Sequence, residues 1–228
     1  MRTIFLIACF FLFTEQTNAQ SAKEIIAQVN HHFAKVKDYS ADIGIFFRIP
    51  GVNIEAITGK VFYKKPDKFR VKTKGIVFLP KQNPYYGLAL LKDTNAYTAI
   101  LSGNEKLQTV NCAVINVIPN NENDLILGKF WIDHAKGVII KSQLTTKSNG
   151  TIVVENHFGS MEQYVLPDKI VFTVDMTKFK VPKAVAVELN AKNTGNKNPT
   201  RKDTGVIELT FRNYALNKQL KDDVFTQQ

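Results

Sequence analysis

The sequence predicts an α+β protein that is mostly antiparallel β. We expect a sheet of roughly nine to twelve strands, rolled into an incomplete, half-open barrel and covered by an amphipathic N-terminal helix. One stretch of helical apolar spacing comes first, and about a dozen short runs with a period of two follow it. These runs lie too close together for parallel crossovers, which need a dozen or more intervening residues. A sheet of this size has more apolar surface than one helix can cover, so it must curve.

The composition suits one folded unit that follows an export signal. Of the 228 residues, 44% are hydrophobic, which is enough for a sizeable core. Residues 1–19 contain the parts of a secretory signal peptide: a charged start at Arg2, an apolar stretch over residues 4–13, and the small-x-small ending Thr17-Asn18-Ala19. We therefore expect cleavage after Ala19, export to the periplasm, and a single domain over residues 20–228.

A second interpretation makes this signal that of a lipoprotein. Leu6-Ile7-Ala8-Cys9 would be the lipobox, and a lipid on Cys9 would anchor the protein to a membrane. The apolar stretch continues past Cys9 to Phe13, whereas the apolar region of a signal normally precedes the cut. Cleavage after Ala19 is therefore favoured over a lipid anchor.

Removal of the signal leaves Cys112 as the one cysteine, so the exported chain cannot form an internal disulfide. Cys112 lies in an apolar run over residues 110–118, and single cysteines in such runs are typically buried as small hydrophobes. No neighbour in the sequence offers the base or the positive charge that a nucleophilic cysteine needs.

The chain is strongly basic, with a net charge of +10. Cleavage after Ala19 removes one Arg and one Glu and leaves this value unchanged. Such a surface is attracted to anionic membrane surfaces and to acidic partners, and salt weakens the attraction. The lysines are scattered over predicted strands and turns instead of forming a stripe with interleaved aromatic residues, so the sequence does not predict nucleic-acid binding.

The first folded element is predicted to be a helix over residues 22–37. Ser21 and Glu24 fit a capping box, in which each side chain accepts a hydrogen bond from the other residue's backbone N–H. His31 and His32 point about 100° apart on a helix, so they cannot bind one metal ion together. The apolar stripe of this helix consists of Ile25, Ile26, Val29, Phe33 and Val36.

Strands follow the helix, because the apolar spacing changes to a period of two after Tyr39. Lys92-Asp93-Thr94-Asn95 is predicted to be a turn between two of these strands. Residues 75–86 are apolar but contain two prolines, and they either fold over the mouth of a cavity or pack in the core. The predicted strands are 41–49, 53–65, 68–73, 86–91, 97–101, 106–118, 125–132, 137–146, 151–158, 169–176, 183–190 and 205–214.

Residues 59–71 are predicted to form a hairpin that turns at Pro66, because proline cannot donate to a central strand ladder. The pattern Gly-x-Val-x-Tyr-x-Lys-Pro-x-x-Phe-Arg, placed after a long helix and a first strand, resembles the signature hairpin of the LolA/LolB family. This family comprises periplasmic carriers and outer-membrane acceptors of lipoproteins. Residues 130–133 with 139–141, and residues 164–170, agree with the wider group of outer membrane lipoprotein-sorting proteins.

The resemblance implies an incomplete β-barrel whose concave apolar interior holds the acyl chains of a lipoprotein, or another lipid, in transit across the periplasm. It also implies an inner-membrane release complex and an outer-membrane acceptor as partners. Carried over onto the hairpin, it places Val61, Phe62, Tyr63 and Phe69 on strands that line or back the cavity. Further candidates for the lining, each equally compatible with plain core, are Ile45, Phe47, Phe78, Tyr97 and Trp131.

Lys65 is the candidate for gating. It occupies the site before the proline where, by the resemblance, the periplasmic carrier has an arginine that hydrogen-bonds to a helical lid. Lysine cannot reproduce the planar fork of arginine, which weakens the expectation that this contact gates the cavity. The sequence shows no clear second lid helix, and residues 80–86 or 119–124 would have to serve.

The sequence does not predict an enzyme. It contains no G-x-S-x-G elbow, S-x-x-K, glycine-rich phosphate loop, C-x-x-C or H-E-x-x-H. Asp133 and His134 are adjacent, but neighbours on a strand point to opposite faces. We expect a monomer without metal or cofactor. The alternative to a carrier is a sensor or binding module of similar fold that recognises an envelope protein partner, for which the basic surface would matter more than the interior.

Overall fold

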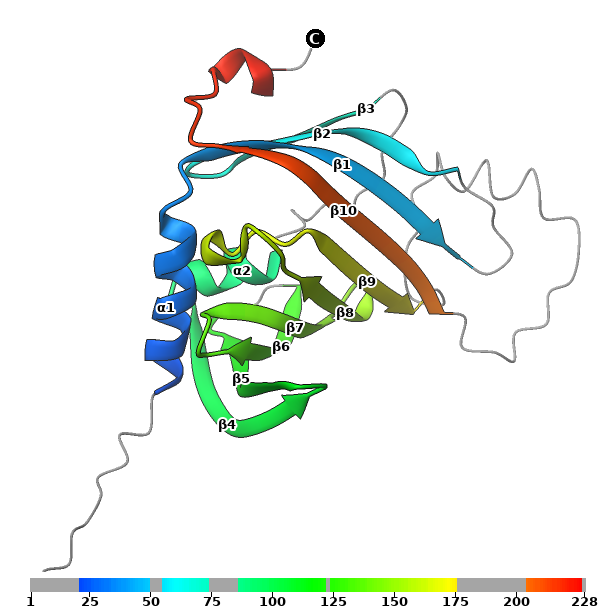
Figure 1. Cartoon of the computed structure of the whole chain (residues 1–228). Helices are drawn as coiled ribbons and strands as arrows, with labels where there is room; N and C mark the ends of the chain where they lie inside the picture. The colour runs from blue at the N-terminus through cyan, green and yellow to red at the C-terminus, as the bar shows by residue number, and fades with distance from the viewer. Residues whose placement is uncertain (1–20, 50–54, 74–85, 122–123, 176–203, 227–228) are drawn as a thin grey trace, which may run out of the picture.

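In the part of the chain that the structure describes, ten antiparallel strands form one open sheet (Figure 1), as predicted. The computed structural model describes residues 21–49, 55–73, 86–121, 124–175 and 204–226. Within these residues the strand order is β3-β2-β1-β10-β9-β8-β7-β6-β5-β4, with β3 and β4 at the two edges. The strands are β1 (Asp38–Arg48), β2 (Ile57–Lys64), β3 (Lys68–Thr73), β4 (Tyr97–Leu107), β5 (Val110–Pro119), β6 (Leu125–Asp133), β7 (Val138–Thr146), β8 (Gly150–His157), β9 (Lys169–Asp175) and β10 (Thr204–Leu216).

The sheet consists of two meanders joined by one long-range pairing. Strands β1 to β3 form one meander and β4 to β10 the other, with each strand next to its neighbours in sequence. The two meet where β1 pairs with β10, so that Ile43 lies opposite Phe211. In Figure 1 these two strands run together through the upper part of the molecule, and β4 to β9 lie below them.

Helix α1 (Ala22–Ala34) begins with the predicted capping box. The Ser21 amide donates to Glu24 Oε2 at 2.8 Å, and the Glu24 amide donates to Ser21 Oγ at 3.3 Å. The helix ends at Ala34, three residues before the predicted end. The amides of Lys35 and Val36 donate to carbonyls three residues back, which closes the helix in a tight turn, and β1 begins at Asp38.

Residues 86–92 form a second helix, α2 (Tyr86–Lys92), so the strand predicted over residues 86–91 is wrong. Leu88 and Leu91 are buried, and at a spacing of three residues they share one helical face. A short continuous apolar run is compatible with either a buried strand or a buried helix, which explains the error. The predicted turn at residues 92–95 is present, with the Ala96 amide donating to the Asp93 carbonyl, but it joins α2 to β4.

Strand β4 is longer than predicted, because the chain does not turn at residues 102–105. A bulge between Leu101 and Asn104 absorbs the irregularity, and Gly103 has a φ of 114° there, which glycine tolerates. The turn comes at Gln108, where φ is 54°. Elsewhere the strand boundaries agree with the predicted ones to within a few residues, and the predicted strand 183–190 lies outside the described residues.

The two faces of the sheet differ in what they pack against. The inner face is the side on which α1 lies; its side chains and Ile25, Ile26 and Val29 of α1 form one buried apolar cluster. The outer face carries a smaller cluster and most of the charged strand residues. After β10, the chain crosses to the outer side of β3, where the 3₁₀ helix η2 (Asp222–Phe225) lies. Among the described residues no helix is long and apolar enough to span a membrane.

Candidate functional site

The inner face is the candidate site, and four of the nine predicted lining residues are buried in its apolar cluster. Ile45, Val61, Tyr63 and Tyr97 are buried there, none more than 8% exposed. Ile45 and Val61 lie on neighbouring strands, and Tyr97 begins β4 at the opposite edge of the sheet. The strand alternation therefore places these side chains on the face that α1 covers.

Phe47 and Phe69 lie on the same face but are only half-buried. Ile57 and Val71 share this state, and all four belong to the meander of β1 to β3. Apolar side chains of the inner face are thus partly accessible to solvent in this meander. This half-buried set (Phe47, Ile57, Phe69 and Val71) is the part of the inner face where a ligand could add contacts.

Phe62 and Trp131 point the other way, so the structure does not place them on the predicted lining. Phe62 lies between Val61 and Tyr63 in β2, and consecutive strand residues alternate between faces. On the outer face Lys72 Nζ lies 5.6 Å from its ring centroid. The period of two already present in the sequence could have identified this orientation.

Trp131 belongs to a separate outer cluster with Cys112 and Val114. Its indole N–H donates to Glu105 Oε2 at 2.6 Å, and Lys129 Nζ lies 4.5 Å from the ring centroid. These contacts give a partly polar aromatic site on the sheet surface, away from the inner cluster. The remaining candidate, Phe78, lies outside the described residues.

Two aromatic residues that were not predicted to line the site, Phe33 and Tyr39, surround Tyr63 where α1 meets β1. The ring of Tyr39, fully buried, stacks on Tyr63 with centroids 5.4 Å apart, and Phe33 of α1 lies 5.5 Å from Tyr63. Tyr39 lies an even number of residues from Ile43 and Ile45 along β1, so the period of two in the sequence could have placed its side chain on the inner face. These rings fix the C-terminal end of α1 to the sheet.

Helix α2 is fastened to its surroundings at its C-terminal end. The Leu91 carbonyl accepts hydrogen bonds from Asn30 Nδ2 of α1 at 2.8 Å and from the Tyr97 hydroxyl at 3.0 Å. Burial, with the nearby Asp93 carboxylate, raises the pKa of Tyr97 to about 12, so this hydroxyl remains a donor at neutral pH. One carbonyl therefore joins α2 to α1 and to the edge strand β4.

Lys65 contacts a helix, and the helix is α1. Its ammonium group donates to the carbonyl oxygen of Ala34, the last residue of α1, at 2.5 Å. Free carbonyls at a helix C-terminus attract cations, so lysine serves this contact without the fork of arginine. The adjoining Pro66 carbonyl accepts from Lys92 Nζ at the end of α2, at 3.3 Å. The hairpin turn thus contacts the ends of both helices, and a gating role for Lys65 stays a prediction.

Asp133 and Cys112, the other residues with reactive side chains considered above, have structural roles in the part of the chain that the structure describes. Asp133 Oδ1 accepts from the amides of Ala135 and Lys136 in the turn between β6 and β7. Cys112 is buried, and burial, followed by the nearby Asp133, raises the pKa of its thiol to about 11, as expected for an inert cysteine. No three His, Cys, Asp or Glu side chains of these residues are grouped to hold a metal ion.

Comparison with known proteins finds similar folds among solved structures but no similar sequences among curated proteins. A scan of protein-family models gives no match, and neither does a search of curated protein sequences. Among solved structures, a LolA superfamily protein from Nitrosomonas europaea aligns over 92% of this chain and 99% of its own, with a TM-score of 0.60 and 13% identity. The fold is LolA-like.

Two further structures share the LolA-like fold. A putative outer membrane lipoprotein-sorting protein domain from Vibrio parahaemolyticus aligns over 90% of this chain and 97% of its own, with a TM-score of 0.52 and 11% identity. A DUF1329 family protein from Desulfovibrio piger aligns over 91% and 98%, with a TM-score of 0.57 and 8% identity. At these identities the likeness concerns the fold, so the function must be argued from the site.

Proposed function

We propose that the protein is a periplasmic carrier that holds the acyl chains of a lipoprotein, or another lipid, against the inner face of its sheet. The observation that carries this proposal is the half-buried set on the inner face of β1 to β3. Phe47, Ile57, Phe69 and Val71 adjoin the buried cluster, yet each remains partly exposed. An apolar ligand laid on this set would extend the core without unfolding it.

The dimensions of the elements explain why apolar surface is left over. Ten strands spaced about 4.8 Å apart make a sheet roughly 43 Å wide, whereas a helix of 13 residues is only about 20 Å long. Helix α1 has 13 residues and α2 has seven. Among the described residues, these two helices are therefore too short to cover the inner face of the ten strands.

Burial of methylene groups supplies the affinity. Each buried methylene contributes roughly 0.8 kcal/mol, so ten of them would contribute about 8 kcal/mol before the cost of ordering the chain is subtracted. Such binding is strong enough for transport and is reversible if a cover can move. The contacts of α2 with Asn30 and Tyr97, and that of Lys65 with α1, are the polar attachments that would change in such a movement.

The carrier role requires a donor and an acceptor. We infer an envelope location from the signal expected over residues 1–19 and from the lipoprotein-sorting domain among the structural neighbours. A release complex at the inner membrane would load the protein, and an acceptor at the outer membrane would unload it. We expect the protein to work as a monomer, and its net charge of +10 favours approach to anionic membrane surfaces.

The proposal is tested first by native mass spectrometry and lipid extraction on protein purified from its own envelope fraction. Bound lipid or acylated protein at a stoichiometric level is the expected result, and it would identify the cargo class. A clean apo mass, together with failure to take up a fluorescent fatty acid, would contradict the carrier role and favour a binding module.

Two pairs of phenylalanines provide matched variants. Phe46 and Phe47 are consecutive in β1, Phe62 and Phe69 lie on the adjacent strands β2 and β3, and each pair presents one side chain to each face of the sheet. Phe47→Ser and Phe69→Ser should lower uptake of the fluorescent fatty acid at least tenfold, whereas Phe46→Ser and Phe62→Ser should leave it unchanged. Thermal unfolding of all four variants controls for general loss of stability. Equal loss in all four would show that uptake does not depend on the inner face.

A further inference from the structure

The outer face of the β2–β3 hairpin carries two pairs of lysines placed directly opposite each other. Lys60 pairs with Lys72, and Lys64 pairs with Lys68, in the register of the two strands. Like charges directly opposite across a ladder repel each other. An anionic group between the two ammonium groups would stabilise such a pair.

The pair Lys64 and Lys68 already holds such a group, supplied by the chain's own C-terminal segment. Asp222 Oδ1 lies 2.7 Å from Lys64 Nζ, and Asp222 Oδ2 lies 2.8 Å from Lys68 Nζ. Arg70, on the same face of β3, donates to the backbone carbonyls of Val224 and Thr226. This face thus binds an acidic peptide segment through both a carboxylate and its backbone.

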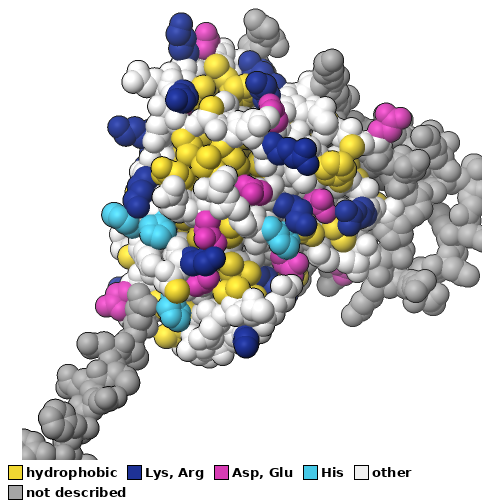
Figure 2. All heavy atoms as spheres, viewed as in Figure 1, with side chains coloured by type: hydrophobic (Ala, Val, Ile, Leu, Met, Phe, Trp, Pro, Cys, Tyr) yellow, Lys and Arg dark blue, Asp and Glu magenta, His cyan; other side chains and the backbone are white. Residues whose placement is uncertain are grey.

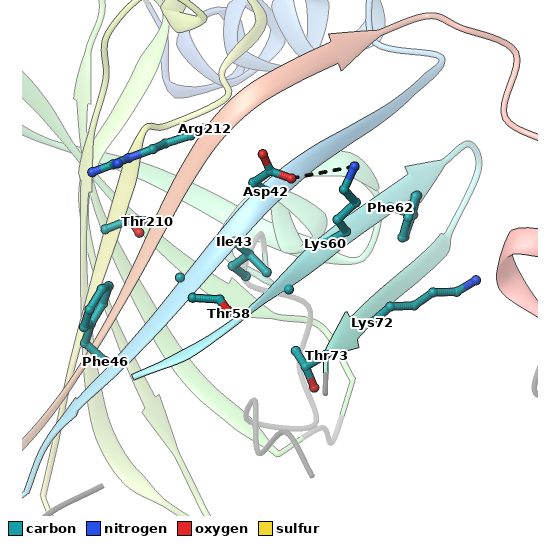
Figure 3. A pocket seen from close by; sticks show the side chains of 12 residues that line it. Asp42, Ile43, Phe46, Thr58, Lys60, Phe62, Lys72, Thr73, Thr210 and Arg212 are labelled. Carbon is teal, nitrogen blue, oxygen red and sulfur yellow. Dashed lines mark ion pairs between the residues drawn. The ribbon is translucent and has the colours of Figure 1, made fainter. Parts of the chain in front are cut away.

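The pair Lys60 and Lys72 has the same placement four residues further along each strand, and it borders an open groove of about 720 Å³ (Figure 3). Asp42 lies 3.8 Å from Lys60 Nζ, a long and exposed ion pair that contributes little. Among the described residues, Lys72 and Arg212 form no ion pair with a carboxylate. Other outer-face residues that line this groove are Gly44, Phe46, Thr58, Phe62 and Thr210.

The groove has an apolar floor beneath its basic rim. A Cβ atom on Gly44 would lie 3.1 Å from Phe46 Cε2, so the Phe46 ring folds back over the glycine. Phe62 is half-buried, with Lys72 Nζ 5.6 Å from its ring centroid. Phe46 is 37% exposed and Phe62 is half-buried, so both rings are accessible from the groove. They can receive the side chain of a bound peptide.

We propose that this groove is a docking site for an extended acidic segment of a partner protein. One carboxylate of the segment lies between Lys60 and Lys72, Arg212 attracts a second, and an apolar side chain packs against Phe46 and Phe62. The chain's own segment at Lys64 and Lys68 shows the binding mode on the same hairpin. The site lies on the outer face and does not depend on lipid binding at the inner face.

The test uses a labelled synthetic peptide with the sequence of residues 221–228, Lys-Asp-Asp-Val-Phe-Thr-Gln-Gln, added to the full protein at low salt and followed by fluorescence anisotropy. The double variant Lys60→Ala/Lys72→Ala should weaken binding at least tenfold. The charge-matched control Lys106→Ala/Lys147→Ala removes two exposed lysines elsewhere and should leave binding unchanged. A peptide with Asn in place of both Asp residues should not bind.

Several outcomes would overturn the proposal. Absence of binding would contradict the proposal directly. Equal weakening in both double variants would show that the peptide is attracted by the overall positive charge of the protein and not by this groove. If Lys64→Ala/Lys68→Ala abolishes binding and Lys60→Ala/Lys72→Ala does not, the peptide has replaced the chain's own segment. If vesicles with anionic lipid bind through Lys60 and Lys72 while the peptide does not, the face docks on membranes instead. Thermal unfolding of each variant shows whether it is folded.

Discussion

The ammonium group of Lys65 lies 2.5 Å from the carbonyl oxygen of Ala34, where the β2–β3 hairpin turn meets the end of α1. Ala34 is the last residue of the helix, and its carbonyl has no partner four residues further along. Stability of the last turn of α1 therefore depends on a side chain from a different element.

Loss of this contact should loosen the end of α1. We expect Lys65→Ala to lower the free energy of unfolding by about 0.5–1 kcal/mol, because the bond is exposed, and to speed amide hydrogen exchange in the last turn of α1. The control is Lys35→Ala, which removes an exposed lysine beside the same helix end. Unchanged exchange in Lys65→Ala would show that the aromatic contacts of Tyr39 and Tyr63, with the hydrogen bond from Asn217 Nδ2 to the Lys35 carbonyl, are enough to fix this end.

The attachment of α2 can be tested through its two consecutive leucines. Leu91 is fully buried and Leu90 is half-buried. Leu91→Ala should therefore cost about 2–5 kcal/mol of unfolding free energy, and Leu90→Ala only about 1 kcal/mol, as measured by urea denaturation. Similar losses for the two variants would mean that α2 does not pack on the sheet through the Leu88 and Leu91 face.

Cys112 should be unreactive in the folded protein. Burial raises the pKa of its thiol to about 11, so very little thiolate exists at pH 8, and the side chain is not accessible. Treatment of the protein that begins at residue 20 with a thiol reagent at pH 8 should modify Cys112 only after urea unfolding. Rapid modification of the folded protein would contradict the buried position on the outer face of β5.

The contact of the C-terminal segment should weaken in acid. Hydrogen bonds from Lys64 and Lys68 lower the pKa of Asp222 from 3.8 to about 2. The stabilisation from this carboxylate is therefore present above pH 3.8, the unfolded value, and is lost as the pH falls through about 2. Nuclear magnetic resonance titration of the carboxyl carbon should show this pKa, and Lys64→Ala should move it back toward 3.8. A midpoint near 3.8 in the unmodified protein would exclude the two lysine contacts.

Elements with strong periodicity were predictable from the sequence. The capping box at Ser21 and the alternation along β1 determine where α1 begins and which side of β1 faces it, since both signals are local. Residues 86–91 were misassigned because tertiary packing, not local sequence, selects a helix there. The segment packs against β6 and β7, and a Cβ atom on Gly87 would lie 3.3 Å from Phe130 Cε1.

The candidate site was predictable in part. The resemblance placed Phe62 on a strand that lines or backs the interior, and strand parity puts its side chain on the outer face, where Trp131 also lies. The contact of Lys65 with Ala34 and that of Asp222 with Lys64 join residues that are far apart in sequence. Such contacts arise from tertiary packing, and no pattern along the chain indicates them.

The pairing of β1 with β10 has a consequence for how the protein is made. Residues 39–48 pair with residues 206–216, so the ladder that joins the two meanders cannot form until almost the whole chain is available. Long-range strand pairing of this kind slows folding and leaves unpaired strand edges exposed meanwhile. A newly made chain would therefore pass through a vulnerable stage in which β1 to β3 and β4 to β9 are present but not yet joined. A truncation before β10 would leave the chain in that state permanently.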